Sequence, residues 1–133
     1  MKRYQSVVGP FFFALLLVQL SACSKDPREK LYGTWKGTTK IEQNITITIR
    51  PDSTIEIDTQ VDSVREIRKG TYTIVDRRLR IALTRRETYT GDRVVREDKV
   101  DQDEAVFTFT GENEMVLRKG TQAMILQRVA APG

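Results

Sequence analysis

The sequence offers few side chains that could carry out covalent chemistry. Cys23 is the only cysteine, and the chain contains no histidine. Neither a Ser–His nor a Cys–His pair can form, because each needs an imidazole to take the proton of the nucleophile. Glu56 and Asp58 are spaced as paired hydrolytic carboxylates on one strand face could be. Ile55 and Ile57 would occupy the opposite face, so we interpret the pair as solvent-facing and expect no enzymatic activity.

A group of carboxylates further along the chain could bind a cation. Oxygen ligands at such spacing are suited to Ca²⁺. The stretch has neither the order of an EF-hand loop nor a glycine at its turn position, so we expect a solvated loop. Soft metals need cysteine or histidine ligands, and we therefore expect no metal site and no cofactor. The carboxylates are those of Asp98, Asp101, Asp103 and Glu104.

Five arginines crowd into one predicted hairpin, where they could contact an anionic surface such as lipid headgroups. Arg78 and Arg80 alternate with Leu79 and Ile81, so the same pattern also fits the solvated outer face of a strand. The sequence leaves both interpretations open. The five residues are Arg77, Arg78, Arg80, Arg85 and Arg86.

Residues 1–22 have the three parts of an export signal. Lys2 and Arg3 give a positive start, and an unbroken apolar run over 11–18 follows. This run is shorter than the ~20 residues that a membrane span needs. The alternative is an uncleaved anchor helix over about 7–22, which the short run and the placement of Cys23 disfavour.

Leu20-Ser21-Ala22-Cys23 resembles the lipobox of bacterial lipoproteins. The resemblance implies cleavage after Ala22, lipidation of the Cys23 thiol and acylation of the new amino group. Two or more acyl chains anchor a protein stably, since each buried CH₂ contributes about 0.8 kcal/mol. Ser24 stands where an aspartate would favour retention in the inner membrane. The resemblance therefore implies a lipid-anchored protein of the cell envelope, on the periplasmic face of the outer membrane.

These features divide the chain into a signal peptide at 1–22, a lipidated cysteine with a polar tether at 23–30, and one domain at 31–133. The signal peptide holds two basic and no acidic residues, so the formal charge of +4 falls to about +2 in the mature protein. This balance and the expected compartment argue against a nucleic-acid partner. A single cysteine allows no disulfide within the chain, so a hydrophobic core must supply the stability.

From residue 31 onward, apolar and polar side chains alternate with the period of two expected of strands. Turn residues at 50–53 separate two such runs, and the pattern then repeats along the chain. We predict an all-β domain of about eight or nine strands. Consecutive hairpins favour an antiparallel up-and-down barrel, which leaves few exposed edges. The residues expected to point inward are Ile45, Ile47, Ile49, Tyr72, Ile74, Phe107 and Phe109.

Gly33-Thr34-Trp35 resembles the Gly-x-Trp opening of the lipocalin-like domains of bacterial lipoproteins, and Gly70-Thr71-Tyr72 is similar to a second motif of that group. In lipocalins the tryptophan closes one barrel end and an arginine of the last strand lies across it. The resemblance implies that Arg128 pairs with Trp35, with Arg118 as the second candidate. Such a cation–π contact is worth about 0.5–2 kcal/mol.

Barrels of about eight strands are either filled by their own side chains or hold one small ligand. Two functional hypotheses follow. The first is a membrane-anchored lipoprotein with a lipocalin-like domain that binds a small apolar ligand. The alternative is a structural or protein-interaction lipoprotein of the cell envelope, with a solid barrel and no ligand.

Overall fold

The computed structural model describes residues 27–38 and 43–130 of the chain. The chain divides into two units, Met1–Lys30 and Leu31–Gly133. The described part of the first unit belongs to a one-turn helix, α2 (Pro27–Leu31). No helix within the described ranges has the length and apolar character needed to cross a membrane.

The helix α2 occupies the end of the segment that the sequence predicts to be a polar tether. Proline is favoured at the first position of a helix because its fixed φ suits the helical backbone, and Pro27 occupies that position. The predicted tether is therefore helical over its last residues. The predicted signal peptide at 1–22, its cleavage position Ala22 and the lipidation candidate Cys23 lie outside the described residues.

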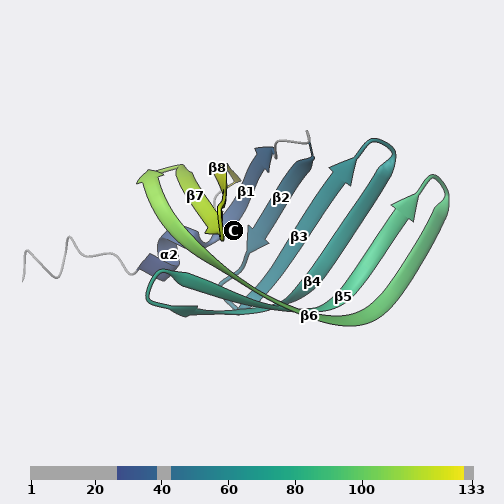
Figure 1. Ribbon diagram of the computed structural model, residues 1–133, viewed down its shortest axis with the longest axis horizontal. Helices are drawn as coiled ribbons and strands as arrows, with labels where there is room; N and C mark the ends of the chain where they lie inside the picture. Colours follow the sequence, from purple (N-terminus) through teal and green to yellow (C-terminus); the bar gives the residue numbers. More distant parts are fainter. Residues whose placement is uncertain (1–26, 39–42, 131–133) are drawn as a thin grey trace, which may run out of the picture. The chain divides into compact units, whose positions relative to one another are not determined.

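The second unit is a closed antiparallel barrel of eight strands, in which each strand pairs with its chain neighbours and β8 returns to β1 (Figure 1). The prediction of an up-and-down barrel is thus confirmed. The strands are β1 (Gly33–Thr38), β2 (Asn44–Ile49), β3 (Thr54–Val61), β4 (Val64–Val75), β5 (Arg78–Thr90), β6 (Arg93–Gly111), β7 (Glu114–Lys119) and β8 (Gln122–Ala130).

From β2 onward, tight turns join the strands, and small or short polar residues occupy the turn positions with positive φ. Asp62 and Asp76 have φ values of 53° and 57°, a conformation that aspartate tolerates better than most residues. In the predicted turn at 50–53, Asp52 Oδ1 accepts hydrogen bonds from the Thr54 backbone nitrogen at 3.0 Å and from its hydroxyl at 2.6 Å. Hydrogen bonds within this turn therefore stabilise it, and its geometry fixes which residues of the two flanking strands pair.

Three strands, β4, β5 and β6, are longer than the rest (Figure 1). Their segments 64–69, 85–90 and 93–98, here termed the sheet extension, pair with β3 on one side and continue past the backbone pairing of β6 with β7 on the other. β7 pairs with β6 only from Val106 onward, so the first part of β6 has a partner on one side alone. The polar residues 98–104 belong to this strand, and the expected loop there is wrong. All residues of β6 from Arg93 to Val100 are exposed. Neither face of the strand is buried there, so its sequence lacks the alternation of apolar and polar residues that indicates a strand.

A bulge at Thr84 marks the start of the extension. Leu83 and Arg85 of β5 have register partners on both β4 and β6, whereas Thr84 between them has none. Gly70 lies beside it, and a Cβ at this position would stand 2.0 Å from the Ala82 carbonyl oxygen. A bulge exchanges the faces to which later residues of its strand point. Arg86 therefore lies on the inner face, although the buried residues before the bulge have odd numbers.

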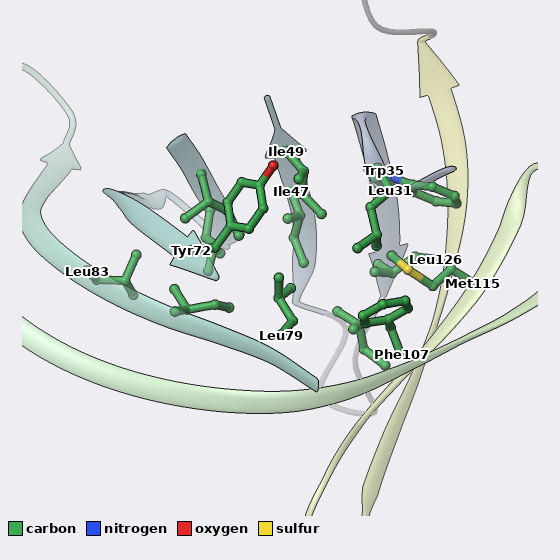
Figure 2. Close-up of a cluster of buried hydrophobic side chains, with 14 residues drawn as sticks. Leu31, Trp35, Ile47, Ile49, Tyr72, Leu79, Leu83, Phe107, Met115 and Leu126 are labelled. Atoms are coloured by element: carbon green, nitrogen blue, oxygen red, sulfur yellow. The ribbon is translucent and has the colours of Figure 1, made fainter. Parts of the chain in front are cut away.

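The barrel interior is filled by side chains from all eight strands, together with Leu31. Figure 2 shows labelled members of this core pointing from the strands into the interior. Leu31, Trp35, Leu79, Met115 and Leu126 are each 0% exposed. Each residue predicted to point inward either belongs to the core or packs against it.

Candidate functional site

The end of the barrel at which β1 begins and β8 ends is closed by Trp35. Its indole nitrogen donates a hydrogen bond to the Leu31 carbonyl oxygen at 2.9 Å. The guanidinium carbon of Arg128 lies 4.3 Å from the centroid of the indole ring, and this arginine donates to the Tyr32 carbonyl oxygen. The ring of Phe109 contacts the indole from a centroid distance of 6.3 Å. These interactions join β1 to β8 and the core.

The arrangement around Trp35 is structural in character. The indole is fully buried and its only polar atom is already hydrogen-bonded, so it offers no donor to a ligand. Arg128, and not Arg118, is the arginine that covers the ring; Arg118 lies exposed on β7. The pair therefore fixes where the last strand meets the first strand.

The five arginines of the predicted basic hairpin do not form one surface. Arg78 and Arg80 are exposed and both pair with Glu104, at 3.3 and 3.5 Å. Arg77 is exposed in the turn before β5. Arg85 and Arg86 follow the bulge, and consecutive strand residues point to opposite faces.

The inner face of the sheet extension carries charges that the sequence analysis did not predict. Arg68 and Arg86 lie directly opposite each other on β4 and β5. Arg86 donates to Glu97 Oε2 at 2.7 Å, which raises the pKa of this arginine, and Arg68 Nε lies 3.3 Å from Glu66 Oε1. The Nε atoms of both arginines are buried and make no hydrogen bond to a described residue, so the contact of Arg68 Nε with Glu66 is an ion pair without a hydrogen bond.

Opposite charges also connect β6 with β7 where their backbones no longer pair. Lys119 donates to Asp103 Oδ2 at 2.8 Å. Asp103 lies on the inner side of β6, because its register partner Ile81 is buried in the core. One ion pair therefore bridges the two strands beyond their last backbone pair, and the polar inner face adjoins the apolar core.

A network of charges around Glu87 covers the outer face of the extension. Glu87 is only 6% exposed, and its carboxylate accepts a hydrogen bond from the Tyr89 hydroxyl at 2.8 Å. Lys69 Nζ and Arg96 Nε lie 3.2 and 3.4 Å from its oxygens. The hydrogen bond from Tyr89, followed by the contact with Lys69, lowers the pKa of Glu87 to about 2. Glu87 therefore stays ionised throughout the physiological range.

Glu56 and Asp58, the two carboxylates considered as a hydrolytic pair from the sequence, both lie on this outer face. Asp58 accepts hydrogen bonds from Arg65 Nε on both carboxylate oxygens at 3.1 Å and from Arg65 Nη2 on Oδ2 at 2.6 Å. Arg65 also lies over the ring of Tyr89. Glu56 lies 3.3 Å from Arg50 and 3.9 Å from Lys69. Each carboxylate is held in an ion pair. Within the described part of the chain, no three acidic residues gather in a way that could hold a metal ion.

Two hollows lie on the outer face of the long strands. One, of about 680 Å³, spans β4, β5 and β6 and is lined mainly by Thr71, Thr73, Arg80, Ala82, Gln102 and Glu104. The second, of about 420 Å³, lies over β3, β4 and β5 beside the bulge. Most side chains that line them alternate along the strands with buried core residues, so both hollows open away from the barrel interior.

No protein-family model, curated protein or solved structure matches this chain.

Proposed function

We propose that this protein is a lipid-anchored component of the bacterial cell envelope whose barrel is a solid scaffold. Cys23 would hold it on the periplasmic face of the outer membrane, and its surface would contact other envelope components. The observation that carries the scaffold proposal is the filled interior, to which every strand contributes a buried side chain.

The polarity of the remaining surfaces favours a scaffold over a carrier of a small apolar ligand. Sites for such ligands are concave and lined mostly by apolar side chains. Both hollows described here are instead bordered by arginine, threonine and carboxylate side chains. Beyond the bulge, the inner face carries Arg68 and Arg86 with their carboxylate partners. An apolar molecule would have to displace core residues or desolvate these charges.

The lipocalin-like relationship and the anchor are parts of the same proposal. An eight-stranded barrel with Trp35 at one end and Arg128 across its ring is the arrangement that the lipocalin resemblance implies. The anchor rests on the sequence Leu20-Ser21-Ala22-Cys23 and on the apolar run before it. Several acyl chains on Cys23 would keep the domain at the membrane without a spanning segment.

The anchor is tested by growing cells with a labelled fatty acid and comparing Cys23→Ser with Ser24→Ala. We expect Cys23→Ser to remain uncleaved and unlabelled, because the thiol is the acceptor of the lipid. The matched control Ser24→Ala should be cleaved and labelled like the native chain. Equal labelling of the Cys23→Ser protein would refute the lipidation.

The scaffold is tested by extracting the full chain from its membranes in mild detergent and measuring its mass under native conditions. We expect the mass of the acylated chain with no further small molecule. Cross-linking before extraction should join the chain to another envelope protein. An apolar molecule retained at one copy per chain would overturn the solid barrel and support the ligand-binding alternative.

A further inference from the structure

The hollow beside the bulge, here termed the bulge hollow, gathers cationic and hydroxyl groups from three strands and one turn. It has a volume of about 420 Å³ and lies where Thr84 interrupts the pairing of β4 with β5. Its lining contains three cationic side chains, three threonines and a single carboxylate. These residues are Arg50, Lys69, Arg85, Thr54, Thr71, Thr84 and Glu56.

The charges in the bulge hollow are not balanced. Arg50 and Lys69 share the carboxylate of Glu56, and Lys69 also contacts Glu87. Arg85 has no ion pair or hydrogen bond with any described side chain. Asp98 faces it across the β5–β6 ladder, but the two side chains form no ion pair within 4.0 Å. The residues that line the hollow therefore carry an excess of positive charge, and the guanidinium of Arg85 has no partner among the described side chains.

The position of Arg85 intensifies this imbalance. It lies directly opposite Lys69 on the neighbouring strand, and like charges at directly opposed positions destabilise a sheet. An anion between the two side chains would turn this repulsion into attraction. A guanidinium presents paired donors that match phosphate oxygens, and an ammonium adds a compact charge. Threonine hydroxyls can complete the set of donors.

We propose that the bulge hollow binds a phosphate group through Arg85 and Lys69, with Arg50 and the threonine hydroxyls around it. The hollow lies within the size range of small-molecule sites, about 300–1,000 Å³, and leaves room for the group esterified to the phosphate. The phosphate could belong to a phospholipid headgroup or to a soluble phosphate ester. The site does not depend on the anchor or the scaffold role proposed above.

The test is a titration of the full chain in neutral detergent with inorganic phosphate, followed through the backbone amide signals by NMR. We expect saturable shifts at Thr71 and Thr84 that sodium chloride at equal ionic strength does not reproduce. Arg85→Gln should weaken phosphate binding about tenfold, as loss of a charge-assisted contact does. Because Arg85 has no side-chain partner to lose within residues 27–38 and 43–130, the fold should be unchanged.

Arg77→Gln is the matched control, since it removes the same charge from an exposed arginine outside the hollow. Its affinity for phosphate should stay within about twofold of the native value. Equal weakening in the two variants, or an absence of saturable shifts, would overturn the site. Thr84→Val provides a second variant that keeps the charge, and we expect a smaller but measurable loss.

Two soluble probes distinguish the sources of the phosphate. Glycerophosphoglycerol carries the diester of a phosphatidylglycerol headgroup, whereas glycerol 3-phosphate is a monoester. Tighter binding of the diester would assign the site to a lipid headgroup, and tighter binding of the monoester to a soluble phosphate ester. Failure of both probes and of inorganic phosphate would contradict the proposal while leaving the anchor at Cys23 untouched.

Discussion

Replacing Trp35 with phenylalanine tests whether this residue closes the barrel. The change leaves the buried Leu31 carbonyl oxygen without its donor, which costs about 1–3 kcal/mol. The smaller ring leaves a cavity of a few tens of Å³, which adds about 1 kcal/mol. We therefore expect Trp35→Phe to lower the free energy of unfolding by about 2–4 kcal/mol, and the melting temperature by about 10 °C or more.

Urea unfolding followed by far-ultraviolet circular dichroism measures this loss, because the variant lacks the only tryptophan of the chain and its fluorescence. Arg128→Met removes the cation over the ring and its hydrogen bond to Tyr32, so it should cost about 1–3 kcal/mol. Arg118→Met, at an exposed position of β7, is the matched control and should stay within about 0.5 kcal/mol. A loss below about 1 kcal/mol for Trp35→Phe, or equal losses for the two arginines, would refute the reasoning.

Two further predictions concern the sheet extension. Gly70→Ala places a Cβ against the Ala82 carbonyl oxygen and should destabilise the chain by about 1–3 kcal/mol in urea unfolding, whereas Gly111→Ala, whose Cβ would meet nothing closer than 3.9 Å, should cost much less. The lowered pKa of Glu87 means that its stabilising effect is complete above its ordinary pKa of 4.5 and is lost as the pH falls towards 2. Glu87→Gln should flatten this part of the curve of unfolding free energy against pH, and an unchanged slope would contradict the network.

The barrel could be predicted from the sequence where one face of each strand is buried. Ile47 and Ile49 alternate with threonines because the isoleucines enter the core and the threonines do not. The same rule fails along the first half of β6, where both faces meet solvent and no apolar period remains. The strand forms there because its backbone pairs with β5, and backbone pairing does not require particular side chains that a sequence pattern could reveal.

The candidate sites were less accessible to sequence analysis, for a different physical reason. The pairing of Trp35 with Arg128 was expected only through a resemblance, since no spacing rule connects residues so far apart in the chain. The bulge hollow could not be foreseen at all. It needs the turn residue Arg50, the β4 residue Lys69 and the β5 residue Arg85 to meet, and that meeting depends on register.

The bulge at Thr84 connects these observations. If the strand continued through Thr84 without a bulge, alternation from the buried Leu83 would send Arg85 to the inner face and Arg86 outward. With it, Arg86 pairs with Glu97 on the inner face and Arg85 borders the bulge hollow outside. The bulge thus keeps Arg85 on the outer surface, where it has no ion pair with any side chain in the described part of the chain. Bulges are common where a strand re-aims side chains beside a functional site. Deleting Thr84 would set Arg85 directly after Leu83, still facing outward opposite Lys69, so phosphate binding should survive with only the smaller loss due to the missing threonine hydroxyl.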